Sequence, residues 1–257
     1  MTKRVILIAA GRGSRLEHYT DERPKCMVQL GGRSILEYQL EAFRKNEISD
    51  FHVIRGYLSE KLVLPGATYY ENPEWERNNI LHSLFCARPA LVGSLLTTYS
   101  DIVFTPGVVK KALSMPGDIN LIVDRQWART YEGRRDHPVE QAELTEVDES
   151  LQVLRVGKHV GPERALGEFI GLASYSPRGI QIMCDVFDRL QRRLGEDDLF
   201  REGRIFRKAY LADLFEEIIA AGHPIHAIPI DGGWREIDTV EDLHSATELL
   251  SGEGATL

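Results

Sequence analysis

The chain has 257 residues, of which 43% are hydrophobic and 27% are charged, and its formal net charge at pH 7 is −8. This composition is ordinary for a globular protein that can bury a substantial core, and the negative charge argues against a general nucleic-acid binder. The three cysteines form no CxxC pair, which argues against a disulfide framework and a zinc site and favours a cytoplasmic location. No apolar run approaches the roughly 20 residues of a membrane span, which argues against a membrane helix.

The first half of the chain alternates short apolar strands with amphipathic helices. Residues 5–9 are typical of a buried strand and run directly into Gly-Arg-Gly, so we do not interpret this start as a signal peptide. Ser34 and Glu37 form a capping box for the first helix. Such alternation predicts a parallel sheet covered by helices on both faces. The expected strands are 5–9, 51–56, 67–72, 94–101 and 119–124, and the expected helices begin near 34, 78 and 106.

The pattern changes after Asp124, where a β-rich segment interrupts the alternation. Residues 139–157 predict a β-hairpin that turns near 148–150, and residues 167–176 predict a further strand. Two helices are expected next, at about 177–194 and 204–222, and then a strand at 225–231 and a closing helix capped by Thr239. We therefore expect one domain over residues 1–250, an insertion at about 125–166, and a frayed tail at 251–257.

A glycine-rich turn, AAGRGSR at 9–15, follows the first predicted strand. A dinucleotide-binding fingerprint requires a third glycine where Leu16 stands, and the acid expected at the end of the second strand is missing. A Walker A motif is also absent. Glycines let backbone N–H groups close on phosphate oxygens, and Arg15 and Lys25 can add positive charge there. These features favour a nucleoside triphosphate held for chemistry, with solvated loop residues as the alternative.

Together with ERPK at 22–25, this turn resembles the L-A-A-G-x-G-x-R-L … P-K signature of the sugar-phosphate nucleotidyltransferase superfamily. Further segments are most similar to those of the phosphonate and phosphocholine cytidylyltransferases: NPEWERNNILHSL at 72–84, YEGRRDHPVEQAE at 131–143, GEFIGLASYS at 167–176 and WREIDTVEDL at 234–243. The resemblance covers residues 5 to about 250. It implies an α/β, Rossmann-like fold of the nucleotidyltransferase or GT-A-like type, with a mixed, mostly parallel sheet flanked by helices and a small β-rich insertion.

Nucleotidyl transfer requires a divalent ion, and Mg²⁺ typically takes one or two protein carboxylates. Open α/β sheets bind ligands at the carboxyl ends of their strands. Asp101 ends a predicted strand and Asp238 precedes a capped helix, and the resemblance places the metal-binding aspartates at these two positions. The alternatives are a turn aspartate at 101 and a helix N-terminal acid at 238. Glu236 is a second-ranked metal candidate.

Candidate nucleotide-binding residues lie in the glycine-rich turn and in the predicted helix at 78–91. Asn79 and Ser83 are four residues apart and therefore share one helical face, although a helix cap is an alternative role for Asn79. By analogy with the family, Lys25 reaches the α-phosphate, and Lys25 and Arg15 are the catalytic candidates. The choice of CTP rests on the resemblance. The predicted nucleotide-binding residues are Ala9, Ala10, Gly11, Gly13, Ser14, Arg15, Lys25, Asn79 and Ser83.

An acceptor site is predicted around residues 124–138, which hold four arginines, two aromatic residues and a histidine. Arginine and histidine can bind a phosphonate or phosphate, and an aromatic ring can face an amine or a quaternary ammonium. Glu168, an acid on an otherwise apolar strand, can receive a substrate amine or pair within the fold. A solvated flap is the alternative for the whole segment. The predicted acceptor-binding residues are Arg125, Arg129, Tyr131, Arg134, His137 and Glu168.

The resemblance implies a Mg²⁺-dependent cytidylyltransferase that joins CTP to a small phosphonate, such as 2-aminoethylphosphonate or a hydroxyalkyl phosphonate. Phosphocholine and a sugar 1-phosphate are the alternative acceptors. A non-catalytic nucleotide sensor is disfavoured, because Arg15, Lys25, Asp101 and Asp238 are all present. We expect an acceptor oxygen to attack the α-phosphorus in line. Small molecules are the expected partners, without nucleic acid or membrane, and the protein is expected to be a monomer or a homodimer.

Overall fold

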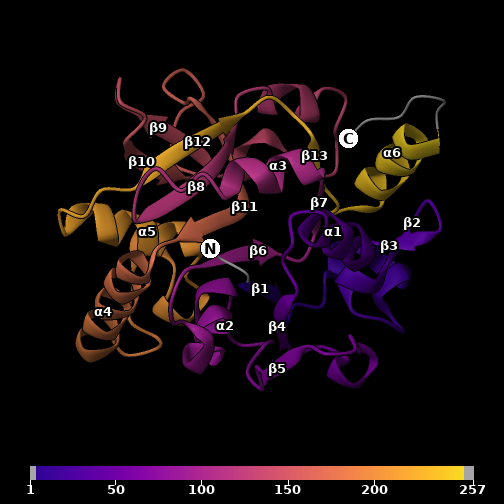
Figure 1. Cartoon of the computed structure of the whole chain (residues 1–257), viewed down its shortest axis with the longest axis horizontal. Helices are drawn as coiled ribbons and strands as arrows, with labels where there is room; N and C mark the ends of the chain where they lie inside the picture. The colour runs from indigo at the N-terminus through magenta and orange to yellow at the C-terminus, as the bar shows by residue number, and fades with distance from the viewer. Residues whose placement is uncertain (1–3, 252–257) are drawn as a thin grey trace.

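The computed structural model describes residues 4–251, so the predicted frayed tail lies outside the described residues except for Ser251. A nine-stranded sheet forms the centre of the fold (Figure 1). In it, β1 (Arg4–Ala9) runs parallel to β4 (Asp50–Arg55) on one side and to β6 (Leu95–Tyr99) on the other. Strand β5 (Thr68–Glu71) extends the sheet beyond β4 in the same direction. The carboxyl ends of these four strands therefore lie at one edge of the sheet.

The long strand β11 (Gly167–Tyr175) runs antiparallel between the two halves of the sheet. One of its edges pairs with β8 (Ile119–Asp124), which is parallel to β12 (His226–Ile230). Its other edge pairs first with β9 (Leu144–Val147) and then with β6, and β9 forms the predicted hairpin with β10 (Val153–Gly157). The sheet is thus mixed and mostly parallel, as predicted, and the insertion joins it where β6 ends.

A bulge in β11 shapes the point where β6 gives way to β9. The register between β11 and β8 shifts between Phe169 and Ala173. Gly171 lies inside this bulge with a φ of 80°, and a Cβ there would collide with the ring of Tyr99. Glycine is therefore required both by the backbone conformation and by the close approach of the ring. The bulge lets Tyr99 lie against β11 at the end of β6.

Helices cover both faces of the sheet, as the alternation of β1 requires. Ile6 and Ile8 pack in one cluster with α2 (Ile80–Cys86), α4 (Pro177–Arg193) and α5 (Leu211–Ala220). Val5, Leu7 and Ala9 pack in a second cluster with α1 (Ile35–Arg44) and α3 (Pro106–Ala112). Figure 1 shows these two helix groups on opposite sides of the sheet. The predicted capping box of α1 is present, with Ser34 and Glu37 bonding each other's backbone N–H groups.

Two small sheets were not predicted. Strand β7 (Ile102–Phe104) is antiparallel to β13 (Trp234–Glu236), and β2 (Gln29–Leu30) is antiparallel to β3 (Arg33–Ser34). The β7–β13 pair is important for the site, because Asp101 immediately precedes β7 and Asp238 follows β13. The backbone N–H of Ile237 donates to the Asp101 carbonyl oxygen over 2.7 Å. This pairing brings two acids that are distant in sequence to the same place, beside the start of α6 (Val240–Ser251).

Two predicted helices are shorter than expected. The helix predicted at 204–222 begins only at Leu211, because Ile205 is extended in a bridge with Leu199 and Asp213 caps the backbone N–H of Tyr210. The helix predicted at 78–91 ends at Cys86, and a separate 3-10 turn that contains proline follows at Arg88–Ala90. Within residues 4–251, no helix has the length and apolar character needed to cross a membrane.

Candidate active site

Two adjoining hollows open at the carboxyl ends of β1 and β6. The glycine-turn pocket, of about 290 Å³, is lined by the turn after β1, by Trp75 and by the start of α2. The insertion pocket, of about 200 Å³, is lined by residues of the insertion, of β11 and of β13. The two pockets share one set of lining residues: Arg15, Asn79, Ile80, Tyr99, Asp101 and Asp238. A molecule in one pocket would therefore meet a molecule in the other at these residues.

Lys25 lines the glycine-turn pocket next to this shared wall and holds the two predicted metal-binding aspartates together. Its Nζ donates to Asp101 Oδ2 over 2.8 Å and to Asp238 Oδ1 over 2.6 Å, and the residue is only 7% exposed. Burial alone would lower the pKa of Lys25, but the two carboxylates outweigh it and hold this pKa above its usual value. The ammonium is therefore fixed in its charged form.

Asp238 is the more heavily paired of the two acids. Besides Lys25, it contacts the Arg15 guanidinium at 2.5 Å and His137 Nδ1 at 3.1 Å. Burial would raise the pKa of Asp238, but Lys25, His137 and Arg15 outweigh it and hold this pKa well below its usual range. Asp101, by contrast, has one unpaired oxygen, because its buried Oδ1 has no hydrogen-bond partner among the described residues. That oxygen is available to a ligand or to a cation.

The glycine-rich turn makes room for Lys25. Gly13 has a φ of 68°, and a Cβ placed on it would lie 2.7 Å from Lys25 Cδ. We predicted that these glycines bring backbone N–H groups close to phosphate; the structure adds the packing of the lysine stem as a reason for Gly13. Gly11, Gly13, Ser14 and Arg15 all line the glycine-turn pocket, as does Ala10.

Replacing Gly13 with alanine is expected to displace the Lys25 side chain and to lower turnover by about 10- to 100-fold, because small displacements of a positioned group are costly. Gly93→Ala is the matched control, since Gly93 has a similar φ of 73° but open space around the position of a Cβ. Both variants are expected to lose about 1 kcal/mol of stability from the backbone conformation. Turnover and thermal unfolding are measured together. Equal activity in the two variants would contradict the role given to Gly13.

The start of α2 forms the far side of the glycine-turn pocket. Asn79 caps α2, accepting from the Ile80 N–H over 2.8 Å and donating to the Lys208 carbonyl oxygen over 3.2 Å. Ser83 donates to the Asn79 carbonyl oxygen and accepts from Asn72. The two predicted residues thus line the pocket while taking part in the local hydrogen bonding. Asn78 and Trp75, which were not predicted as site residues, also line it.

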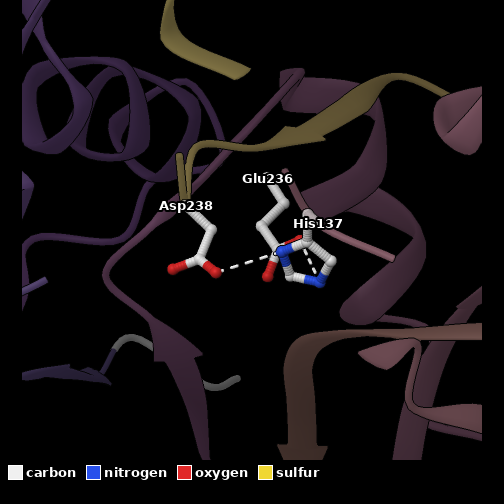
Figure 2. Close-up of side chains that lie close together, drawn as sticks. All are labelled: His137, Glu236 and Asp238. Atoms are coloured by element: carbon white, nitrogen blue, oxygen red, sulfur yellow. Dashed lines mark hydrogen bonds and ion pairs between the residues drawn. The ribbon is translucent and has the colours of Figure 1, made fainter. Parts of the chain in front are cut away.

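The structure brings two of the six predicted acceptor residues into the linings of these pockets. His137 and Glu168 line the insertion pocket. Figure 2 shows the His137 ring linked by dashed lines to both Asp238 and Glu236. The distance from His137 Nε2 to Glu236 Oε2 is 3.7 Å. One ligating atom from each of these three residues lies within 4.8 Å of the others, so the group could also hold a cation. Burial and the charge of Asp238 raise the pKa of Glu236 above its usual value.

The three predicted arginines lie elsewhere. Arg125 forms an exposed ion pair with Asp231, and Arg129 donates to its neighbour Gln126. Arg134 is buried and is bound by Asp242 and Glu236, so it joins the insertion to α6. None of the three lines either pocket. Tyr131 does not line either pocket but holds a residue that does, because its hydroxyl donates to Glu168 Oε1 over 2.7 Å.

The insertion pocket also contains residues that were not predicted: Gln141, Glu143, Lys158 and Tyr210 away from the shared wall, and Tyr99 at that wall. Glu143 and Lys158 flank the β9–β10 hairpin, Glu143 lying within the predicted range of 139–157, and Tyr210 precedes α5. Alternation along a hairpin distinguishes its two faces but does not tell which face meets a pocket. Only the bulge in β11 and the packing of the hairpin beside β6 place these side chains around one hollow.

Known proteins are similar to this chain over most of its length. The family described as the MobA-like NTP transferase domain matches residues 5–164. The chain is 27% identical over 255 residues to CTP:phosphoglutamine cytidylyltransferase of Campylobacter jejuni, covering 95% of this chain and 98% of that protein. It is 23% identical over 244 residues to 2-aminoethylphosphonate cytidylyltransferase of Lancefieldella rimae, covering 93% of this chain and 89% of the relative.

A solved structure shares the fold. The inositol-1-phosphate CTP transferase of T. maritima superposes with a TM-score of 0.73 at 20% sequence identity. The match covers 100% of this chain and 98% of the other. The predicted sheet architecture is therefore found in a complete chain of known structure.

Proposed function

Because the chain belongs to the family of MobA-like NTP transferase domains and is a nucleotidyltransferase, we propose that it is a cytidylyltransferase. It joins the CMP part of CTP to a small phosphonate or phosphate monoester and releases pyrophosphate. The cytidylyltransferases of C. jejuni and L. rimae, which align with more than nine tenths of this chain, support the choice of CTP. The acceptors in their names, phosphoglutamine and 2-aminoethylphosphonate, support a small acceptor with a polar end.

The single observation that carries this proposal is the position of Asp101 and Asp238 at the wall between two pockets, with Lys25 bonded to both from the glycine-turn pocket. A group transfer between two bound molecules needs its charged groups at the point where those molecules meet. The glycine-turn pocket is assigned to CTP and the insertion pocket to the acceptor. Lys25 and Arg15 then stand beside the α-phosphate, where charge changes during the reaction.

The two aspartates fit a divalent cation such as Mg²⁺. Asp101 Oδ1 is a buried carboxylate oxygen without a partner among the residues that the structure describes, and Asp238 faces it across Lys25. Hard cations of this kind prefer carboxylate oxygens and retain water and phosphate ligands. When bound, the cation would neutralise phosphate charge and favour the departure of pyrophosphate. Glu236 and His137 lie close enough to assist in holding it.

The proposed reaction needs no general base. An oxygen of the acceptor's phosphonate or phosphate, already anionic near neutral pH, attacks the α-phosphorus of CTP. A new O–P bond forms, the bond from the α-phosphorus to the bridging oxygen breaks, and pyrophosphate leaves with that electron pair. The chain supplies position and positive charge through Lys25 and Arg15. In this proposal, Ala10, Gly11 and Ser83 lie near the nucleoside.

A phosphonate such as 2-aminoethylphosphonate or a hydroxyalkyl phosphonate is the leading acceptor class. The buried carboxylates of the insertion pocket favour an acceptor with a cationic end, which disfavours a sugar 1-phosphate. Phosphocholine remains the second candidate, since Phe169, Tyr99 and Tyr210 provide aromatic surface in the same pocket.

The test is pyrophosphate release over a grid of nucleotides and acceptors. CTP, UTP, dTTP, ATP and GTP are each combined with phosphonates, phosphocholine and sugar 1-phosphates, with and without Mg²⁺. We expect turnover with CTP and a small phosphonate in the presence of Mg²⁺ only. Turnover with UTP or dTTP and a sugar phosphate would overturn the cytidylyl assignment.

A further inference from the structure

The far end of the insertion pocket contains ionisable groups of both signs that do not pair with one another. Glu143, Glu168 and Lys158 line it, more remote from the glycine-turn pocket than Asp101 and Asp238. The proposed phosphoryl transfer uses none of the three. Glu168 is buried, Glu143 and Lys158 are half-buried, and ionisable groups held away from water without an oppositely charged partner are costly, so their presence calls for a reason.

Glu168 presents a carboxylate oxygen that lacks a hydrogen-bond donor. Its Oε1 accepts from the Tyr131 hydroxyl over 2.7 Å, whereas its Oε2 is buried without a partner among the described residues. The residue is only 6% exposed, and burial raises the pKa of Glu168 to about 8, with the nearby Glu236 adding to the rise. A cationic ligand with N–H groups would satisfy Oε2 and favour the ionised carboxylate.

Glu143 and Lys158 interact at a distance but do not touch. Glu143 Oε2 accepts from the Tyr99 hydroxyl over 3.2 Å. Burial raises the pKa of Glu143 to about 7, and Lys158 limits the rise. Lys158 donates to Gln141 Oε1 over 2.7 Å and to the Tyr210 hydroxyl over 3.5 Å, and it makes no ion pair within 4.0 Å among the described side chains. Nζ also lies 4.6 Å from the centre of the Tyr210 ring, and without a carboxylate partner among the described residues the ammonium can meet an anion.

These three groups together fit a zwitterionic ligand. We propose that the acceptor carries an amino-acid head, with an ammonium that donates to Glu143 and Glu168 and a carboxylate that accepts from Lys158. An ammonium with three N–H donors satisfies the open acceptors, which a quaternary ammonium cannot do. The inference rests on the proposed function, in which the phosphonate or phosphate at the other end of the acceptor lies beside Asp101 and Asp238.

The test uses acceptors that differ only by a carboxylate. 2-Amino-4-phosphonobutyrate is compared with 3-aminopropylphosphonate, and O-phosphoserine with phosphoethanolamine, each with CTP and Mg²⁺. The wild-type protein is expected to prefer the amino acid of at least one pair by about 10-fold or more in kcat/KM, the range of a hydrogen bond between charged groups.

Lys158→Met is expected to lower kcat/KM for that amino acid by about 10- to 100-fold while leaving its amine partner and the KM for CTP within about twofold. Glu168→Gln is expected to weaken both members of the pair, because each carries the ammonium. Lys110→Met, a change of an exposed lysine on α3 outside both pockets, is the matched control. A merely structural role for Lys158 would lower all acceptors alike.

The outcomes separate this inference from the proposed function. Three results would overturn the amino-acid head while leaving cytidylyl transfer intact. They are equal use of both members of each pair by the wild type, unchanged selectivity for the amino acid in Lys158→Met, and a preference for phosphocholine. Absence of pyrophosphate with CTP and every acceptor in the wider grid would overturn both.

Discussion

Lys25→Met is expected to reduce nucleotidyl transfer by about 100- to 1000-fold, the loss typical of removing one positioned electrostatic donor from a reaction centre. Lys25 is the only residue that bonds both Asp101 and Asp238 among the described side chains. Methionine retains much of the stem that packs against Gly13 but carries no charge. The effect is therefore expected mainly in kcat, and it is measured as pyrophosphate release at saturating substrate.

The same variant has a second expected property. In the wild-type protein, the Lys25 ammonium occupies one oxygen of each aspartate. Without it, the two carboxylates face one another with less compensation, although Asp238 keeps Arg15 and His137. We expect lower stability in the absence of divalent ions and a larger rise in unfolding temperature when Mg²⁺ or Mn²⁺ is added than the wild type shows.

Lys110→Met again provides the control, since it removes one positive charge without touching the pockets. If Lys25→Met retained at least half of the wild-type turnover, the lysine would be a structural cross-link between the aspartates and the catalytic role proposed for it would be wrong.

The glycine-rich turn and the two aspartates could be located from the sequence because each depends on local pattern. A buried strand followed by glycines fixes where β1 ends, and an acid after an apolar strand lies at the carboxyl edge of a parallel sheet. The structure adds a connection that the sequence could not supply, because β7 and β13 are three residues each and carry no clear strand pattern. Their pairing brings Asp101 beside Asp238.

The acceptor side was harder to predict because arginine has two common uses. A run of arginines in an insertion is compatible with binding a phosphonate and equally with ion pairs inside the protein. Arg134 illustrates the second use, bound by Asp242 of α6 more than one hundred residues away in sequence. The residues that line the pocket instead, Glu143 and Lys158, depend on how the β9–β10 hairpin packs beside β6, which is a long-range property.

Asp101→Asn gives the sharpest test of the metal site. Asparagine keeps the shape of the side chain and one oxygen but removes its charge, and the structure gives Asp101 one side-chain partner, Lys25. We expect turnover to fall by about 100- to 1000-fold and the requirement for Mg²⁺ to shift to higher concentration. Pyrophosphate release is measured against Mg²⁺ concentration. Asp188→Asn, which alters a surface ion pair between Asp188 of α4 and Arg88, is expected to leave the turnover and the Mg²⁺ requirement unchanged.

Asp101 separates the two interpretations of this site better than Asp238 does. Replacing Asp238 would break contacts to Lys25, Arg15 and His137 at once. A loss of activity could then come from a rearrangement of the residues between the two pockets. At Asp101, the unpaired Oδ1 has no structural partner to lose among the described residues, and the free energy of unfolding is expected to change by only about 1 kcal/mol. A folded Asp101→Asn protein with near-normal turnover would show that Asp101 is a turn residue, and the cation would then have to be held by Asp238, Glu236 and His137.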